Sequence, residues 1–271
     1  MIAPTVSQLR IFPVKSLEGL QVDQAEVGIH GLKWDRHFAI VAKDGQLISG
    51  KRNPEVNRLA VSYNLPEQQI NLRDRSQERA YQFPLEVGHK ELDEYLSDYF
   101  QLAVSLHHDI EGGFQDIPRI GSLSMYGSAS LKALHADLDR HEIDELRRRF
   151  RVNVEINTED PYWEDQLYIR PGLGVKCLIG DVEAIGVAPR VRCAVPPLDT
   201  RTSELDTSFV DDLIAHRRKS DEDRLLAYGR STYYFAVDLF LDKSESNKVI
   251  RIGDPVKTLE EVELKPIGLL R

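Results

Sequence analysis

Apolar and polar residues alternate along most of the chain with a period of two residues. Such alternation is typical of β-strands that bury one face. It occurs in seven stretches, at residues 8–14, 37–49, 56–64, 152–156, 175–187, 233–241 and 248–256. Asp44-Gly45, Leu65–Gln69 and Gly180-Asp181 each separate two apolar stretches with residues that favour tight turns. The pattern therefore predicts antiparallel pairing of neighbouring strands.

A period near 3.6 residues, typical of amphipathic helices, occurs in only a few short segments. These are residues 92–99, 131–138, 143–150 and 209–214. The segment from His107 to Ser122 contains glycine and proline and has little periodicity, so it is a candidate junction between two β-rich halves. Residues 264–271 have the composition of a short tail. The predicted fold is mainly β with short helices, in the α+β class.

Composition narrows the range of partners. The chain has 271 residues, of which 41% are hydrophobic, enough for a substantial core. It has 35 basic and 44 acidic residues, and the net charge of −9 disfavours nucleic acid and anionic membranes as partners. No apolar run approaches the ~20 residues that cross a bilayer, and the N-terminus lacks a signal-peptide pattern. With only two cysteines, we expect a cytoplasmic protein without structural disulfides.

The two cysteines lie in different settings. Cys177 lies within the apolar strand predicted at 175–187, a position typical of a small buried residue. Cys193 follows arginines at positions 190 and 192 and precedes Pro196-Pro197, which end the strand. Positive charge or a metal stabilises a thiolate, so Cys193 is a candidate nucleophile or metal ligand. From the spacing of these residues alone, an ordinary structural role for Cys193 is still favoured.

Other candidate motifs are weak. His107-His108 occupy adjacent strand positions whose side chains face opposite ways, so ordinary solvent exposure explains them better than a metal site does. The run from Arg147 to Arg151 matches the cations that stabilise a helix C-terminus, although Arg151 lies beyond the helix and is a candidate binding residue. The chain has no phosphate-binding G-x-x-x-x-G-K-[ST] loop and no nucleophile elbow.

Six motifs occur in an order similar to that of the MOSC family. They are Pro13-Val14-Lys15-Ser16, Asp35-Arg36, the segment Lys51 to Pro54, Phe150-Arg151-Val152-Asn153, Arg192-Cys193 and the closing segment 250–256. The resemblance covers nearly the whole chain and points to the members that reduce amidoximes and N-hydroxylated bases. It implies two β-barrel-like domains, an N-terminal MOSC-associated barrel at residues 1–115 and a MOSC barrel at residues 116–271.

The resemblance also implies a molybdenum cofactor, a pterin dithiolene with a terminal phosphate. Cys193 matches the cysteine that binds molybdenum, and is therefore the implied metal ligand and a catalytic residue. The implied cofactor-binding residues are Lys15, Ser16, Arg36, Lys51, Ser122, Arg151, Asn153 and Arg192. Lysine, forked arginines and hydroxyl groups suit a phosphate, and the cations would offset an anionic centre in an acidic protein.

The segment after Cys193 departs from the family pattern. Relatives commonly have a Thr-Thr-Val-Asp-Pro-like run there, whereas Pro196-Pro197 replaces both hydroxyl residues in this chain. Two hydrogen-bond donors near the metal are thereby lost. Lys51 stands where arginine is usual, which removes a bidentate fork. Asp199 is retained, either as a catalytic residue that orients a proton or substrate near the metal or as a cap of the turn that follows.

From these features we predict a reductase of small N-hydroxylated compounds, which include hydroxylamines, amidoximes and N-hydroxylated bases. Its electrons are expected from a separate ferredoxin-like protein or flavin reductase, because the chain has no cysteine quartet for an iron–sulfur cluster. One alternative is a sulfur carrier that holds a persulfide on Cys193. Another is a non-catalytic barrel that binds anions. The natural substrate, the donor, the oligomeric state and any nucleotide on the pterin are left open by the sequence.

Overall fold

The computed structural model describes residues 3–117, 122–266 and 268–269. The strands are β1 (Thr5–Ile11), β2 (Leu20–Val22), β3 (Gln24–Glu26), β4 (Phe38–Ala42), β5 (Leu59–Asn64), β6 (Gln69–Asp74), β7 (Tyr81–Pro84), β8 (Val104–His108), β9 (Leu123–Gly127), β10 (Val154–Asn157), β11 (Tyr168–Arg170), β12 (Leu173–Ile179), β13 (Val182–Val191), β14 (Tyr234–Phe240), β15 (Val249–Arg251) and β16 (Val256–Glu263). The helices are α1 (Lys90–Phe100), α2 (Ser128–Asp137), α3 (Ile143–Phe150) and α4 (Phe209–Leu226), with short 3-10 turns at Pro54–Arg58, Trp163–Leu167 and Lys243–Glu245. The predicted class, mainly β with helices, is confirmed.

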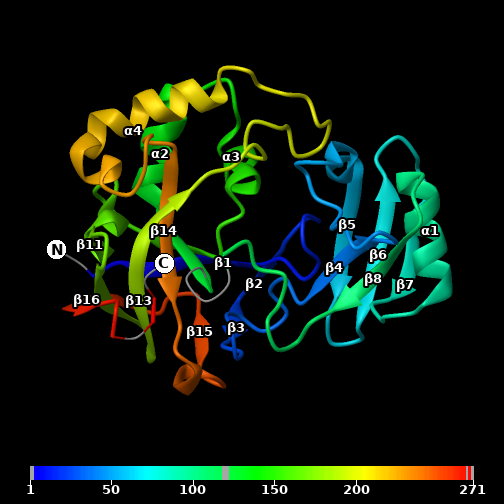
Figure 1. Cartoon of the computed structure of the whole chain (residues 1–271), viewed down its shortest axis with the longest axis horizontal. Coiled ribbons are helices and arrows are strands. Elements are labelled where there is room, and N and C mark those ends of the chain that lie inside the picture. Colours follow the sequence, from blue (N-terminus) through cyan, green and yellow to red (C-terminus); the bar gives the residue numbers. More distant parts are fainter. Residues whose placement is uncertain (1–2, 118–121, 267, 270–271) are drawn as a thin grey trace.

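The largest sheet has nine strands and contains both the first strand, β1, and the last strand, β16. Its order is β11-β12-β13-β14-β9-β10-β1-β2, and β16 pairs with β12. β1 therefore lies beside β10, and β3 pairs with β15, across the domain boundary expected near residue 115. In Figure 1 this sheet and helices α2 to α4 form the lobe on the left, and β4 to β8 with α1 form the smaller lobe on the right.

The strand connections differ from the prediction in two respects. Most neighbouring strands pair antiparallel, but β9 and β10 pair in parallel. The reason is that α2 and α3 connect them and return the chain to the starting edge, as a parallel crossover requires. Within the described residues the large sheet runs from β11 to β2 without pairing its two ends, and the smaller sheets have two or three strands. Of the prediction of two β-barrel-like domains, the mainly β character is therefore confirmed, whereas no closed barrel is found among the described residues.

The packing of α3 fixes the position of the residues that follow it. Phe150, the last residue of α3, stacks on Phe235 of β14 with ring centroids 4.2 Å apart. Phe209 of α4 also packs against the Phe150 ring, with ring centroids 6.0 Å apart. All three rings are buried. Because these aromatic contacts join α3 and α4 to the sheet, Arg151 emerges from the helix at a fixed point beside β1.

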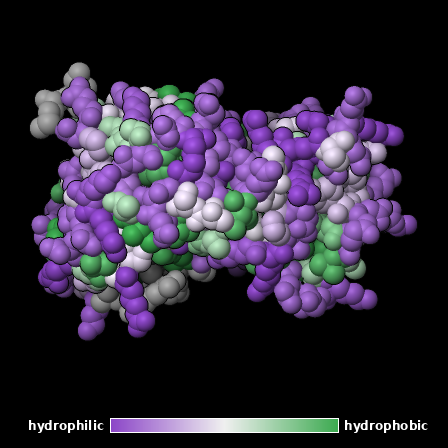
Figure 2. All heavy atoms as spheres, turned by 90° about the horizontal axis from the view of Figure 1, so that it is seen from above, coloured by the Kyte–Doolittle hydropathy of each residue, from purple (hydrophilic) through white to green (hydrophobic). Residues whose placement is uncertain are grey.

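Most apolar side chains of the described residues are buried, although some large ones, such as Ile110 and Leu205, are exposed. The face shown in Figure 2 is largely hydrophilic, with apolar residues in small separate groups. Residues 264–271, expected to be a tail, are packed in their described part: Leu264 and Leu269 are buried against Ile185 and Val187 of β13. In the described ranges no helix has the length and apolar character needed to cross a membrane.

Candidate functional site

A cavity of about 750 Å³ lies between the large sheet and the segment at residues 47–61 of the smaller lobe. Its remaining walls come from the end of β1, the end of α3 and the loop after β13. Among the residues that the structure describes, ten basic side chains and two carboxylates, Glu18 and Asp116, line it. The basic residues are Arg10, Lys15, Arg36, Lys51, Arg52, Arg148, Arg149, Arg151, Arg190 and Arg192. In a chain with a net charge of −9, this local positive charge suits an anionic ligand.

Phe12, which directly follows β1, holds two guanidinium groups against its ring. The guanidinium carbon of Arg36 lies 4.8 Å from the ring centroid, and that of Arg151 lies 4.3 Å away. The Asp35 carboxylate forms an ion pair with Arg36 and accepts a hydrogen bond from the backbone N–H of Phe12 at 2.8 Å. Arg36 and Arg151 have φ angles of +57° and +51°, which few non-glycine residues adopt. Strained backbone of this kind is concentrated at binding sites.

Arg151 keeps an unused donor next to the cavity. Its Nη1 donates to the carbonyl oxygen of Leu17 at 2.7 Å, whereas its buried Nη2 has no hydrogen-bond partner among the described residues. Burial, with the nearby charge of Arg36, lowers the pKa of Arg151 to about 10, so the group is charged at neutral pH. A buried cation with an unpaired N–H is costly unless a ligand supplies an acceptor. This geometry fits an oxyanion such as the phosphate of the implied cofactor.

Lys15 and Ser16 line another wall of the cavity. The Lys15 ammonium donates to the carbonyl oxygen of Phe114 at 2.8 Å and to Asp116 Oδ1 at 2.6 Å. Burial disfavours the charged form of Asp116, but the Lys15 charge outweighs it and lowers the pKa of Asp116 to about 2. Ser16 has a φ angle of +70°. Lys15 is thus held in place by a carboxylate that the sequence analysis did not identify.

Cys193 lies just beyond the end of β13, partly exposed in the cavity wall. Its carbonyl oxygen accepts a hydrogen bond from the Tyr233 hydroxyl at 3.2 Å. The guanidinium of Arg192 is buried and donates from Nε to the carbonyl oxygen of Phe235 at 2.9 Å. Burial and the charge of Arg190 lower the pKa of Arg192 to about 9. At about 4 Å and an effective dielectric near 20, one such cation attracts an anion by about 4 kcal/mol before desolvation.

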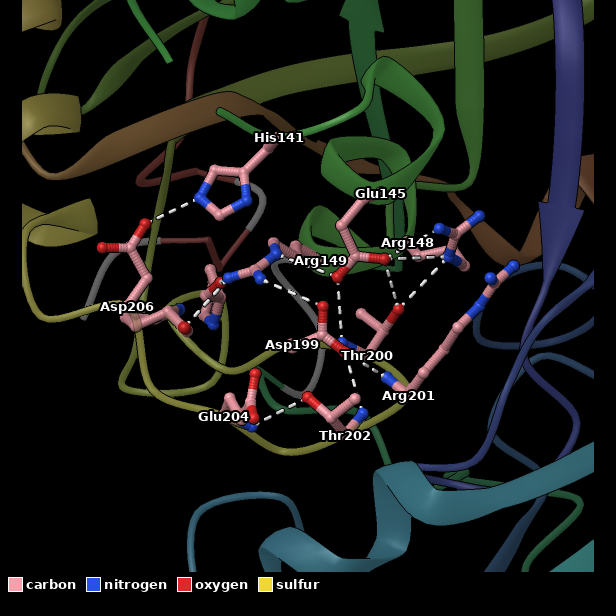
Figure 3. A network of polar contacts seen from close by, with 12 residues as sticks. His141, Glu145, Arg148, Arg149, Asp199, Thr200, Arg201, Thr202, Glu204 and Asp206 are labelled. Carbon is pink, nitrogen blue, oxygen red and sulfur yellow. Dashed lines mark hydrogen bonds and ion pairs between the residues drawn. The ribbon is translucent and has the colours of Figure 1, made fainter. Parts of the chain in front are cut away.

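A buried polar network ties the loop after Cys193 to α3 (Figure 3). Arg149 Nη1 donates to both carbonyl oxygens of Pro196-Pro197, at 2.9 Å each. Glu145 Oε1 accepts from Arg149 Nε at 2.9 Å and from the backbone N–H of Thr200 at 2.9 Å. The two prolines therefore supply carbonyl acceptors to the network, and the network fixes the segment that presents Cys193.

Asp199 is directed toward its own loop. Its Oδ1 accepts hydrogen bonds from the backbone N–H groups of Arg201 and Thr202, at 2.9 and 2.8 Å, and its Oδ2 lies 3.6 Å from Arg149. Burial disfavours its charge, but these backbone hydrogen bonds and the Arg149 cation lower the pKa of Asp199. Asp199 does not line the cavity, and the observed contacts are those of the turn-stabilising alternative.

Seven of the residues implied by the resemblance line this one cavity: Lys15, Ser16, Arg36, Lys51, Arg151, Arg192 and Cys193. Ser122 and Asn153 do not. The Ser122 hydroxyl accepts a hydrogen bond from the backbone N–H of Leu241 at 3.1 Å, and the Asn153 amide donates to the carbonyl oxygen of Arg10 at 3.1 Å. Both side chains are buried, and their observed contacts link segments of the large sheet.

Several cavity cations were not identified from the sequence. Arg148 and Arg149 do lie in the last turn of α3, as the dipole argument requires, but they also line the cavity. Arg10 is the polar residue between buried Leu9 and Ile11 of β1, so its alternation pattern did signal a side chain on the opposite face of the sheet. What the pattern could not signal is that α3 and a cavity lie over that face.

The described protein groups do not form a metal site by themselves. In the ranges that the structure describes, no three or more His, Cys, Asp or Glu side chains are grouped to hold a metal ion. Cys193 would therefore be a single protein ligand, and a metal at this position would need its other ligands from a bound cofactor.

Comparison with protein families covers both walls of the cavity. A profile described as the MOSC N-terminal beta barrel domain matches residues 3–105, and one described as the MOSC domain matches residues 121–257. The chain belongs to the MOSC family. In this MOSC protein the first match contains Lys15 and Arg36 and the second contains Arg151 and Cys193, so the cavity lies where the two matched regions meet.

Curated relatives of the MOSC protein carry molybdenum-related and amidoxime-reducing names. Mitochondrial amidoxime reducing component 2 of Bos taurus is 21% identical over 93% of this chain and 82% of its own length. Mitochondrial amidoxime-reducing component 1 of Mus musculus is 24% identical over 94% and 82% of the two chains. Molybdenum cofactor sulfurase of Caenorhabditis briggsae is 24% identical over 80% of this chain and 32% of its own length. These relatives support a molybdenum-related, oxidoreductase-type function.

Proposed function

We propose that this MOSC protein binds a molybdenum–pterin cofactor and reduces small N-hydroxylated compounds with electrons from a separate donor protein. The observation that carries the proposal is the partly exposed Cys193 thiol in a cavity of about 750 Å³, where ten of the lining side chains that the structure describes are basic. A ferredoxin-like protein or a flavin reductase is the proposed donor. The predicted cytoplasmic location stays a prediction.

The residues present suit such a cofactor. Cys193 would be the protein ligand of the metal, because a cysteine thiolate is a soft ligand of the kind that soft-metal sites use. Arg151, with its unpaired buried Nη2, and Arg36 beside it would bind the phosphate or the pterin edge. Lys15 and Ser16 offer an ammonium and a hydroxyl at the same cavity. When bound and reduced, the cofactor would supply the two electrons that break the N–O bond and would take up the oxygen atom, which two protons convert to water, and the donor protein would return the two electrons.

The chain itself would contribute binding, orientation and charge. Arg192, held by backbone carbonyls and without a carboxylate partner in the described part of the chain, places a fixed positive charge beside Cys193. The Arg149 and Glu145 network holds the loop that carries this cysteine, so the thiol keeps one position while a substrate enters. Asp199, with a lowered pKa and two backbone hydrogen bonds, is suited to shaping this loop rather than to transferring a proton.

The test is to purify the protein from a host that makes the molybdenum cofactor and to measure molybdenum and released pterin per chain. Benzamidoxime reduction with a reduced viologen as artificial donor gives the activity. We expect close to stoichiometric molybdenum and turnover that stops when the donor is omitted. Metal-free protein from such a host would contradict the proposal.

The sulfur carrier is the second candidate, and the similarity to a relative named molybdenum cofactor sulfurase favours it. It uses the same thiol, and basic neighbours would stabilise a persulfide anion as well as a metal thiolate. The intact mass of the purified protein separates the two functions. One extra sulfur atom that maps to Cys193, in protein without molybdenum, would support the carrier. If the purified protein carries no metal and no extra sulfur on Cys193, the non-catalytic anion-binding alternative is the one that is left.

A further inference from the structure

Arg10 is a cation in the cavity wall without a partner. It lies in β1, and its side chain makes no hydrogen bond or ion pair with the described residues. Its Nε is buried and unpaired. Burial and the nearby cations Arg147 and Arg148 lower the pKa of Arg10 and outweigh the opposite effect of Tyr126 and Asp144. A buried N–H group that is left without an acceptor costs free energy.

The carboxylates around Arg10 are already used by other cations. Glu155, on the neighbouring strand β10, is held by Arg147 through contacts of 2.8 and 3.0 Å. Glu145 accepts from Arg148 at 2.8 Å and from Arg149 at 2.9 Å. In the cavity wall, Glu18 forms an ion pair with Arg75. Asp144, whose charge also acts on Arg10, is paired with Arg147 at 2.6 Å. No carboxylate of the described chain therefore forms an ion pair with Arg10, and an acceptor for its guanidinium has to come from a ligand or from water.

The position of Arg10 separates it from the anion site around Phe12. Arg10 and Phe12 are two residues apart, so they share one face of the strand, about 7 Å from each other along its axis. The guanidinium groups of Arg36 and Arg151 lie on the Phe12 ring. Next to Arg10, Gln21 is its paired neighbour on β2, and Gln21 and Arg148 line the same cavity. The guanidinium contacts at the Phe12 ring therefore do not include Arg10, which has its own neighbours in the cavity wall.

We infer that the cavity contains a second anion subsite, formed by Arg10, Gln21 and Arg148, that takes a phosphate or carboxylate group distinct from the anion at Arg36 and Arg151. A guanidinium and an amide are donors suited to such a group. The anionic group has two possible sources. It is either part of the substrate, in which case the preferred substrates are N-hydroxylated compounds with an acidic substituent, or a second phosphate of a nucleotide-extended pterin. The substrate alternative rests on the proposed function, whereas the existence of the subsite does not.

The first experiment compares two substrates that differ by one carboxylate, benzamidoxime and 4-carboxybenzamidoxime, in wild type and in Arg10→Gln. Loss of one charge-assisted contact should lower the ratio of kcat/KM for the carboxylate substrate to that for the neutral one by about tenfold, mainly through KM. Arg10→Lys keeps the charge and should retain most of the ratio. Arg230→Gln, an exposed arginine outside the cavity, removes the same net charge and is the matched control.

The second experiment tests whether the subsite binds a phosphate of the cofactor, and it does not depend on enzyme activity. The molybdenum and any nucleotide released by acid hydrolysis are measured for wild type and Arg10→Gln purified side by side. A released nucleotide, together with a lower molybdenum content in Arg10→Gln, assigns the subsite to an extended cofactor. Absence of nucleotide with equal molybdenum content, together with the shifted substrate ratio, assigns it to the substrate.

The third experiment tests the subsite even when the protein holds no molybdenum. Protein from a host without cofactor biosynthesis is titrated with inorganic phosphate by calorimetry. We expect two phosphates per chain in the wild type, with Arg10→Gln weakening one of them and Arg151→Gln the other by about tenfold, because the two sites are separate. Phosphate binding that Arg10→Gln leaves unchanged, or a single phosphate per chain that both variants weaken, would overturn the second subsite. Unaltered thermal unfolding of Arg10→Gln establishes that the variant is folded.

Discussion

The two cysteines of this protein lie on one antiparallel ribbon and have opposite surroundings. Cys177, in the middle of β12, pairs with Ala184 of β13 and is fully buried among apolar residues. Cys193 lies where the chain leaves β13 and is partly exposed in the cationic cavity. Burial raises the pKa of Cys177 to about 12, so that thiol is kept neutral. The comparison shows that position along a strand, more than residue type, decides which sulfur is available to a metal.

The largest expected difference between the two cysteines is in thiol reactivity. With its pKa near 12, the Cys177 thiol has about a thousandfold less thiolate at pH 8 than an ordinary cysteine, and it should stay unreactive as the pH rises to about 10. Protein without cofactor, treated with iodoacetamide, should therefore be labelled on Cys193 alone, as peptide mass mapping can show. Labelling of both in urea is the control. Equal labelling rates of Cys177 and Cys193 in the folded protein would contradict the claim that only Cys193 is accessible and reactive.

The next effect concerns turnover. Cys193→Ala should lower benzamidoxime reduction by more than about a hundredfold, because even residues that only support a metal ligand commonly change metal affinity or activity by 10–100-fold. Cys177→Ala shortens a side chain far from the cavity and should retain activity. Initial rates normalised to folded protein measure both. An active Cys193→Ala variant would mean that this sulfur has no part in the reaction.

A smaller effect is expected from the cation with the unpaired donor. Arg151→Gln removes the charge next to Phe12, and we expect about a tenfold weaker hold on the cofactor, the cost of one charge-assisted hydrogen bond. Arg151→Lys keeps the charge but loses the two-pronged guanidinium, so its cofactor retention should lie between that of the wild type and that of Arg151→Gln. The molybdenum retained after extended dialysis is the readout. Full retention in Arg151→Gln would place the cofactor phosphate elsewhere.

The smallest effect is on stability. Cys177→Ser places a hydroxyl in an apolar strand interior and should reduce the free energy of unfolding by about 1–3 kcal/mol. Cys193→Ser changes a partly exposed side chain and should alter it by less than about 0.5 kcal/mol. Urea unfolding of the cofactor-free proteins compares them. Similar losses in both variants would show that Cys193 is a structural residue as well.

The sequence predicts the local features of this protein well. Alternation identified β1, β12, β13 and β14, and the turn at Asp44-Gly45 is present, with a φ angle of +84° at Gly45. These features depend on neighbours in the chain, which the sequence shows directly. The parallel pair β9 and β10 and the lack of a closed barrel within the described residues depend on which distant strands meet, and alternation carries no information on that.

For the candidate site, the sequence predicts which residues take part but not where each side chain points. The resemblance identified Lys15, Arg151 and Cys193, which come from distant parts of the chain and line one cavity. It also implied cofactor contacts for Ser122 and Asn153, and the structure gives both side chains backbone partners within the sheet. Motifs identify residue types at positions, but the direction of each side chain and its competing hydrogen bonds are set by the three-dimensional packing.

The most direct test of the bond between Cys193 and molybdenum is X-ray absorption at the molybdenum edge, on wild type and Cys193→Ser purified from a cofactor-competent host. The account predicts that the variant lacks one of the molybdenum–sulfur distances present in the wild type, whereas Cys177→Ser keeps them all. Identical sulfur coordination in wild type and Cys193→Ser would contradict it.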